Sequence, residues 1–414
     1  MDTRRTYWTA FVATVTFFGG FYALLVPLPR YLADAGLPDW QVGFVLGAFG
    51  VASLLGRPVA GVASDRFGPR RVMLVGAASL MVGALGVVTT TQVGPLFLMR
   101  VLQATGYVAF TTAGTALIVS LVPPAERGRR LAVFGAAANV AIAVTPAAVS
   151  RLMEVAPPTA GLLVSAALAA LGGLLAATLG AAGPVIPSEA RNLDGGEMRD
   201  PLSATRRSRF LVAEPALERS EGLLGMTSIA PRRLWLPMLT AGLFGAGFAA
   251  FFQFAPILAD RRGTIDSGSL YTLYGLGIIA TRFVGGRLLD RLPVARVMVL
   301  AAGLVAIGYA AIAVSDVAAA MAAATLVVAV GNGLFHPALI AHHAALLPGA
   351  PGRATAAFYV GFDLGIGAGS WLFGAVLQFG GLAAMYWTAA LLVAAVVPLT
   401  GLVGAAPREA AAPT

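Results

Sequence analysis

The 414-residue sequence contains no cysteine, so disulfide bonds and thiolate metal sites are excluded. It also contains no lysine, so arginine alone carries the basic charge, and the formal net charge is +9. Charged residues make up only 11% of the chain, whereas roughly a quarter of an ordinary soluble protein is charged. So little charge cannot cover a water-exposed surface of this size, which excludes a soluble globular protein.

What the chain has instead is long apolar runs. Hydrophobic residues make up 58% of it and the mean hydropathy is +0.82, values typical of a polytopic membrane protein. Basic residues fall mainly between the apolar runs, so the expected partner is a lipid bilayer and not a nucleic acid. Taking about 20 apolar residues as one crossing, the sequence predicts helices at 8–30, 40–63, 71–91, 95–121, 131–151, 159–183, 234–258, 268–289, 295–314, 317–345, 354–377 and 382–404.

An internal repeat centres on Asp65 and Asp290, which lie 225 residues apart. Each acid has an Arg eight residues earlier, a Gly four residues earlier and an Arg directly after it. Six residues after each acid stands another Arg, which is followed by Val-Met. The matching pairs are Arg57 and Arg282, Gly61 and Gly286, Arg66 and Arg291, and Arg71 and Arg296. Internal repeats of this kind are typical of transporters, so the chain is predicted to consist of two related halves.

Three parts of the chain follow from this repeat. Residues 1–183 and 234–414 are predicted to form two pseudo-symmetric six-helix bundles, which makes the fold an all-α membrane protein with 12 transmembrane helices. Residues 184–233 mix Pro, Ser, Glu and Arg and contain few aromatics. That composition is typical of a flexible linker, here cytoplasmic, and not of a third domain.

Two motifs resemble a known family. The segment Gly61-Val-Ala-Ser-Asp65-Arg66-Phe-Gly68-Pro-Arg70-Arg71 resembles the signature loop between helices 2 and 3 of the major facilitator superfamily, with a degenerate copy from Gly286 to Arg296. The spacing Arg100-Val-Leu-Gln103-Ala-Thr-Gly106 is similar to that family's helix 4 motif, which is often found in proton-coupled members. The resemblance implies a secondary transporter similar to 12-helix proton-coupled efflux members.

One departure from the family leaves antiport open. Helix 5 of drug antiporters usually carries a Gly-Pro followed by a Gly pair, and segment 144–148 keeps only Pro146. What the resemblance implies beyond this is a small-molecule substrate, coupling to protons, and a monomer in the inner (plasma) membrane of a bacterium. No cofactor, metal or catalytic residue is expected.

The distribution of arginine predicts the orientation, because short cytoplasmic loops carry an excess of basic residues. With the amino terminus inside, one set of loops holds Arg66, Arg70, Arg71, Arg127, Arg129, Arg130, Arg287, Arg291, Arg296 and Arg353. The opposite loops hold only Arg30, Arg151, Arg261 and Arg262. Both termini are therefore predicted to be cytoplasmic.

For the signature loop, the resemblance implies that Asp65 faces the amino end of helix 11, whose exposed N–H groups favour an anion. We expect this contact to act as a latch that joins the two halves when the cavity opens outward and breaks when it opens inward. Arg66, Arg70 and Arg71 either take part in the latch by holding nearby carbonyls and carboxylates, or only keep the loop cytoplasmic.

Charged residues within the spans are costly in hydrocarbon and are usually paired or functional. Asp363 is the one acid that the sequence places deep inside a helix, about 15 Å from the cytoplasmic edge at 1.5 Å per residue, and Arg57 lies at about 12 Å. Since helices 2 and 11 are neighbours in the resembled fold, an Arg57–Asp363 ion pair is expected, and the repeat then predicts that Arg282 faces Asn139. Asp363 is either a fixed partner of Arg57, which stabilises its charged form, or a carrier that loads and releases a proton.

Further polar residues are candidates for coupling or for the substrate cavity. Arg100 could hold an anionic substrate, tune a proton site or bond backbone carbonyls, and Gln103 lies one turn further along the same face. On helix 10, Asn332 and His336 share a face, and His336 could titrate near neutral pH or simply pack. Gln253 on helix 7 is a weaker candidate. The phenylalanines of helix 7 could form an apolar wall for a lipophilic substrate, or face lipid and pack; they are Phe244, Phe248, Phe251 and Phe252.

Three functions are compared. The first is export of a small, amphiphilic molecule against entry of protons. The second is uptake of a nutrient such as a sugar or an organic anion by symport, with Arg100 as the anion clamp. The third, a membrane enzyme or sensor, is disfavoured because the sequence has no His-Glu-x-x-His, no Ser/His/Asp arrangement and no adjacent pair of intramembrane acids. It also has no nucleotide-binding P-loop, so the energy for transport is expected to come from a gradient.

Overall fold

The computed structural model describes residues 3–122, 126–179, 232–346 and 351–404, and within these ranges the chain is helical apart from short connections. Each of the twelve predicted stretches is largely helical in the described part, although the spans do not match the helices one to one. Ten of the described segments are long and apolar enough to cross a membrane. Apart from its last two residues, the predicted linker 184–233 lies outside the described residues.

The first half contains seven helices, because the first predicted span is broken in two. A short turn at residues 24–26 separates the first two helices, and Pro27, which has no N–H to continue the first helix, begins the second. The last helix ends at Ala177, before the predicted residue 183. The helices are α1 (Thr3–Ala23), α2 (Pro27–Asp34), α3 (Asp39–Phe67), α4 (Pro69–Val87), α5 (Val93–Leu121), α6 (Arg127–Leu152) and α7 (Pro158–Ala177).

In the second half, the two spans predicted at 354–377 and 382–404 lie mostly in one long helical element. Gly381 breaks it with a φ of +77°, a backbone conformation that favours glycine. The helices are α9 (Arg232–Arg262), α10 (Ser267–Arg291), α11 (Val294–Val314), α12 (Ala318–Leu346), α13 (Pro351–Ala394) and α14 (Val396–Gly404).

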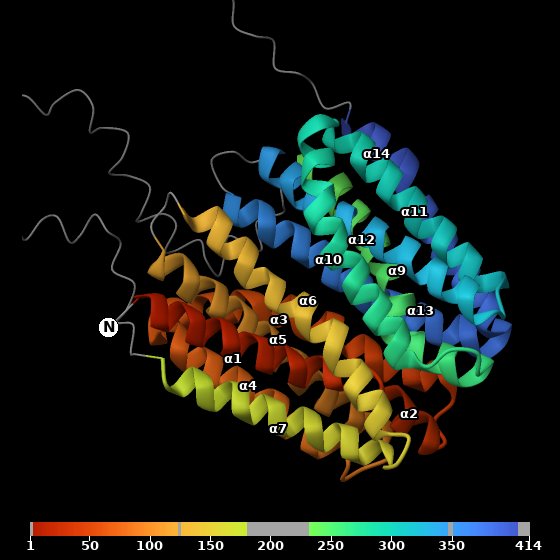
Figure 1. Cartoon of the computed structure of the whole chain (residues 1–414), viewed down its shortest axis with the longest axis horizontal. Helices are drawn as coiled ribbons and strands as arrows, with labels where there is room; N and C mark the ends of the chain where they lie inside the picture. Colours follow the sequence, from red (N-terminus) through yellow and green to blue (C-terminus); the bar gives the residue numbers. More distant parts are fainter. Residues whose placement is uncertain (1–2, 123–125, 180–231, 347–350, 405–414) are drawn as a thin grey trace, which may run out of the picture.

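The two halves form two groups of helices that lie side by side, α1 to α7 in red to yellow and α9 to α14 in green to blue (Figure 1). They meet mainly through two helix pairs, α3 with α13 and α6 with α10. A pseudo-twofold relation exchanges these pairs, since α3 and α10 are the equivalent helices of the repeat. Consistent with this, Asp65 and Asp290 lie near the ends of α3 and α10.

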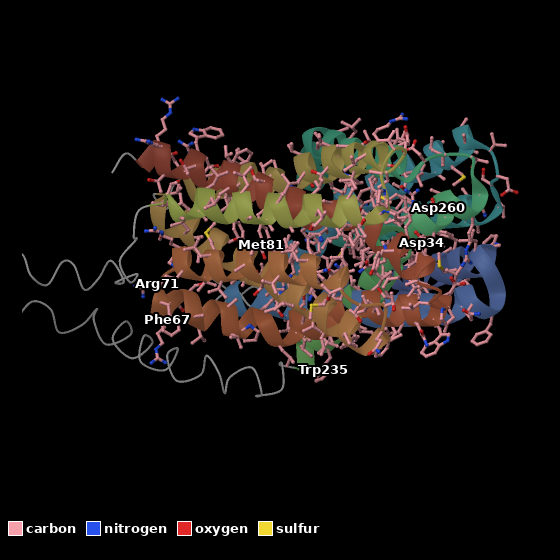
Figure 2. All side chains as sticks on the ribbon, turned by 90° about the horizontal axis from the view of Figure 1, so that it is seen from below. Asp34, Phe67, Arg71, Met81, Trp235 and Asp260 are labelled. Carbon is pink, nitrogen blue, oxygen red and sulfur yellow. The ribbon has the colours of Figure 1, made fainter. Side chains whose placement is uncertain are left out.

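The two ends of the molecule carry different residues. Phe67 and Arg71 lie at one end, which we call the motif end, and Asp34 and Asp260 lie at the opposite end, which we call the far end (Figure 2). At the motif end, Gly68 joins α3 to α4 with a φ of +84°, and Pro69 begins the next helix. Glycine is required here because the chain reverses in a conformation that other residues rarely adopt.

Glycines bring α3 and α13 into backbone contact toward the far end. A Cβ placed on Gly43 would lie 2.5 Å from the Ser370 carbonyl oxygen, and one on Gly50 would lie 2.7 Å from the Gly367 Cα. Toward the motif end, a Cβ on Gly61 would meet nothing within 4 Å. The same helix is therefore tightly packed against the other half toward the far end, whereas the Gly61 position toward the motif end has open space beside it.

Candidate functional site: a central cavity between the halves

A cavity of about 650 Å³ lies between the two halves. Its lining comes from both groups of helices, namely α1, α3, α5 and α6 from the first and α9, α10, α12 and α13 from the second. On α13 the lining extends from Thr355, close to the start of the helix at the motif end, to Ile366, a distance of about 16 Å along the axis. Gly135 on α6 also lines the cavity, and a Cβ placed there would meet nothing within 4 Å. The cavity therefore reaches toward the motif end.

Aromatic rings from both halves form a large part of the cavity wall. Phe248 lies at the centre of one cluster, with ring centroids 4.9 Å from Phe252 and 5.5 Å from Phe362. Phe251, on the same helix, packs inside the second half against Tyr274 at 5.0 Å. The phenylalanines that line the cavity are Phe18, Phe21, Phe49, Phe110, Phe134, Phe244, Phe248, Phe252 and Phe362. Rings of this size favour a lipophilic or aromatic occupant.

Arg57 and Asp363 join the two halves at the cavity wall. The Arg57 Nε donates to Asp363 Oδ2 over 2.7 Å, and the two side chains are 20% and 4% exposed. The guanidinium also lies 4.2 Å from the centre of the Tyr359 ring, which the sequence had not singled out. Among the described lining residues, Asp363 is the only carboxylate, so one basic group of the cavity is neutralised by the one acid.

Arg282 and Asn139, the equivalent residues of the repeat, line the same cavity from α10 and α6. Arg282 is exposed, and it forms no hydrogen bond or ion pair with any described residue. Asn139 is 7% exposed, and its Nδ2 has no hydrogen-bond partner among the described residues. Both arginines of the repeat therefore line one cavity, but of the two only Arg57 forms an ion pair with a described residue.

Two more of the predicted cavity residues, Asn332 and His336, lie on α12. The Asn332 Nδ2 donates to the Tyr274 hydroxyl over 3.1 Å, which ties α12 to α10. The His336 ring packs against Phe358 and Phe362, with ring centroids 4.8 and 5.3 Å away. His336 is therefore held by aromatic contacts at the edge of the cavity.

Arg100 and Gln103 lie behind the cavity wall, outside the lining. Arg100 is 2% exposed; it donates to Gln103 Oε1 over 3.1 Å and to Gln253 Oε1 over 3.4 Å, and it lies 5.7 Å from the Phe21 ring. Gln253, which does line the cavity, therefore connects this buried arginine to the second half. Arg100 pairs with no carboxylate among the described residues, and its charge is met by amide oxygens and a ring.

The signature loop lies at the motif end of the first half (Figure 2). Arg70 Nη2 donates to the Ala177 carbonyl over 2.5 Å, which fixes the loop to the end of α7 within its own half. Asp65, Arg66 and Arg71 are exposed, and Asp65 forms no ion pair with any described residue. In the second half, Gly286, Asp290 and Arg291 lie on α10 with side chains outside the described part, and Arg296 is exposed near the start of α11.

Ion pairs that the sequence analysis missed join the halves at the far end. The Arg30 Nη2 on α2 lies 2.5 Å from the Asp260 Oδ1 on α9, and Arg261 pairs with Asp39 at the start of α3. The backbone N–H of Asp39 also donates to Gln378 Oε1 over 2.8 Å. A sequence signal for these contacts exists, because segments 29–34 and 256–260 share the ending Leu-Ala-Asp at equivalent positions of the repeat. That similarity places the two loops at the same end but gives no pairing.

Two groups of helices that enclose a cavity between them, in a chain whose described part has ten segments long and apolar enough to cross a membrane, form the architecture of a membrane transport protein. The chain belongs to the Major Facilitator Superfamily, whose family model matches residues 10–264 and 263–413. This confirms the family that the signature loop predicted, and with it the all-α membrane fold class. Members of the family are transporters and not enzymes.

Relatives cover the chain in two ways. The MFS-type transporter YhhS of Escherichia coli strain K12 is 24% identical over 93% of this chain and 89% of its own length. The puromycin resistance protein pur8 of Streptomyces alboniger is 36% identical over 29% of this chain, and the match spans 24% of that protein. In three of the relatives, including pur8, the match to this chain spans only between 20% and 24% of the relative's own length.

A solved structure, the human organic anion transporter MFSD10, is 18% identical. It covers 97% of this chain with all of its own length, at a TM-score of 0.66. At this identity the likeness shows the fold alone.

Proposed function

We propose that the protein exports a small, amphiphilic molecule in exchange for protons, by alternating access of the central cavity. The observation that carries the proposal is the cavity itself, with aromatic rings from both halves and, among its described lining residues, a single carboxylate, Asp363, that bridges them. Such a lining suits a molecule with an apolar body and one polar group. The puromycin resistance activity in the name of the relative pur8 fits an export function.

The conformation supports the direction of access. With the arginine-rich loops in the cytoplasm, the motif end faces inward and both termini are cytoplasmic. The cavity then opens to the cytoplasmic side of a bacterial inner membrane. An exporter captures its substrate in this state. In the state that opens outward, Asp65 engages the amino end of α13 and latches the motif end, with Gly61 leaving room for the second half to approach. One chain holds the complete cavity, so a monomer is sufficient.

In this mechanism Asp363 is a structural partner of Arg57. Its carboxylate meets the Arg57 guanidinium at 2.7 Å, and removing either charge would leave the other uncompensated in a low-dielectric wall. We expect Asp363→Asn to abolish both proton-driven transport and downhill exchange. If Asp363→Asn abolishes only the proton-driven mode and leaves downhill exchange intact, Asp363 is the proton carrier and the structural role is wrong.

The second candidate function is proton-coupled uptake of an organic anion. It is favoured by the balance of charge in the cavity, where Arg57 and Arg282 face the one acid. In that reading the same cavity loads its substrate in the outward-open state and releases it inward.

The sign of an imposed pH gradient separates the two candidates. Purified protein is reconstituted in liposomes, and accumulation of a panel of amphiphilic compounds is followed against protein-free liposomes. An exchanger accumulates substrate when the interior is acidic, because protons leave as substrate enters, whereas a symporter does so when the exterior is acidic. A protonophore abolishes either signal. Accumulation that ignores the gradient in both directions contradicts proton coupling altogether.

A further inference from the structure

We propose that the cavity contains an anion-binding subsite at Arg282 and Asn139, and that the transported molecule therefore carries a carboxylate or a similar anionic group. This inference rests on the proposed transport function and narrows its substrate class. It starts from the difference between the two equivalent positions of the repeat.

The first position is complete within the protein. Arg57 of the first half has its counter-ion Asp363 in the second half, 2.7 Å away. At the second position, Arg282 of the second half has Asn139 of the first half where the acid would stand, because Asn139 and Asp363 are 224 residues apart and the two arginines 225. The second position therefore has the arginine of this pair, but an uncharged asparagine in place of the aspartate.

A comparison of the arginines in and near the cavity also identifies Arg282 as the anion-binding group. Arg57 is neutralised by Asp363, and Arg100 is buried behind the wall with amide oxygens of Gln103 and Gln253 as acceptors. Arg282 is exposed and lines the cavity, and it is free of ion pairs within the described part of the chain. A cation at a low-dielectric, partly enclosed site attracts an anion more strongly than it would in water.

Asn139 adds a donor to this charge. Its amide lines the cavity, and no described residue accepts a hydrogen bond from its Nδ2, which is buried in this conformation. Turned toward the cavity, the NH₂ group could donate to one oxygen of a carboxylate while Arg282 donates to the other. Tyr22 and Tyr274 also line the cavity, and their hydroxyls could donate further bonds.

The remaining wall fits the rest of such a molecule. Phe248, Phe252 and Phe362 form a cluster of rings in the same cavity, with centroid separations of 4.9 and 5.5 Å. An aromatic or aliphatic body would lie against these rings while its anionic group reached Arg282. The occupant that the geometry specifies is a lipophilic organic anion of a size that fits about 650 Å³.

The absence of cysteine makes a direct test possible, because one introduced thiol is then the only one in the chain. Ala138, which lines the cavity beside Asn139, is changed to Cys. Its rate of modification is measured in the purified, reconstituted protein with an anionic (sulfonatoethyl) and a cationic (trimethylammonioethyl) methanethiosulfonate. We expect the anionic reagent to react at least about tenfold faster, because Arg282 attracts it.

Three variants in the Ala138→Cys background assign that preference. Arg282→Gln should remove it, and Asn139→Asp should also remove it by supplying the missing carboxylate. Arg151→Gln, which removes one arginine charge from the exposed Arg151–Glu154 pair, should leave it unchanged. A preference that survives Arg282→Gln, or one that Arg151→Gln lowers equally, overturns the subsite.

Protection by a ligand completes the test. We use 2-naphthoate, which combines a carboxylate with an aromatic body, and its neutral counterpart 2-naphthamide. We expect 2-naphthoate at millimolar concentration to slow modification of the introduced thiol several-fold, 2-naphthamide to have little effect, and Arg282→Gln to abolish the protection. Equal protection by both compounds, or no protection by 2-naphthoate, overturns the proposal.

The outcome is separable from that of the transport assay. Gradient-driven accumulation of compounds without any advantage for anions contradicts the subsite and leaves the transport function standing. Protection by 2-naphthoate without gradient-driven transport supports the subsite and contradicts the proton-coupled function.

Discussion

The far end and the motif end of the interface between the halves are packed differently. At the far end, α3 and α13 touch through glycine backbones, and the pairs Arg30–Asp260 and Arg261–Asp39 cross the interface. At the motif end, Gly61 and Gly135 face open space and Asp65 is exposed. The helices therefore diverge from one closed end, and the cavity lies where they separate.

This difference indicates that the angle between the two bundles, and not the packing inside either bundle, determines which end of the cavity is closed. The Arg57–Asp363 pair lies at the boundary, since a Cβ on Gly50 would lie 2.8 Å from the Asp363 carbonyl oxygen. On one side of that boundary the halves are in contact, and on the other side they are apart. Four predictions test this division, in order of decreasing effect on stability.

The largest effect is expected from Asp363→Ala, because it leaves the Arg57 guanidinium at the boundary without its counter-ion. Breaking a buried ion pair by removing one partner typically costs about 3–5 kcal/mol of unfolding free energy. Thermal unfolding of the purified protein in detergent measures the loss. The double variant Arg57→Leu with Asp363→Leu, which removes both charges, should be less destabilised. An unfolding temperature equal to that of the wild type would show that the pair does not join the halves.

Next comes Gly43→Ala at the far end. The added Cβ would lie 2.5 Å from the Ser370 oxygen and 2.6 Å from the Gly374 Cα, so α3 and α13 must move apart. Overpacking of this kind costs about 1–3 kcal/mol, measured in the same unfolding assay. The matched control is Gly61→Ala on the same helix, where the Cβ meets nothing within 4 Å and stability should not fall. Equal losses for both variants would contradict the division into a closed and an open end.

A smaller effect is expected from Arg30→Gln, which breaks the pair with Asp260. The two side chains are 22% and 41% exposed, so the pair contributes only about 0–1 kcal/mol, and salt screens it. The difference in unfolding temperature from the wild type should shrink between low and high ionic strength. Arg151→Gln, which breaks a pair within the first half, is the control for loss of charge alone. A loss that does not depend on salt would point to packing of the arginine chain instead.

The smallest effect on stability is expected from Asp65→Asn, since Asp65 is exposed and unpaired with described residues in this conformation. Its effect should appear in transport, because the latch with α13 is needed only when the motif end closes. Loss of a carboxylate from a helix amino end lowers the closed population by about 2- to 30-fold, and exchange in proteoliposomes should fall by a similar factor. Undiminished exchange with normal membrane insertion would end the latch hypothesis.

Much of the fold could be predicted because it depends on local properties. Apolar runs of about 20 residues predict the spans, and the repeat around Asp65 and Asp290 predicts that α3 and α10 are equivalent. The depths of Arg57 and Asp363 in their helices predicted that these two side chains lie at the same level, and they are 2.7 Å apart. Helix ends were less certain, as the turn at residues 24–26 and the end of α7 at Ala177 illustrate.

The site could be predicted only in part. Gln253, Asn332, His336 and Asp363 line the cavity, whereas Arg100 lies behind its wall. Sequence places a residue on a helix and at a depth, but whether a side chain faces the cavity or packs behind it depends on the rotation of that helix against its neighbours. The role of each of these residues in coupling stays a prediction.

The sequence by itself determined the membrane class, the order of the helices, the relation between the halves and the family, because hydropathy, spacing and motif residues are local features of the chain. Only the tertiary structure decided which end of the interface is closed and which of the predicted polar residues face the cavity, with Arg100 behind its wall. These depend on contacts between residues more than a hundred positions apart. They are set by the tilt between two packed bundles, which no local pattern encodes.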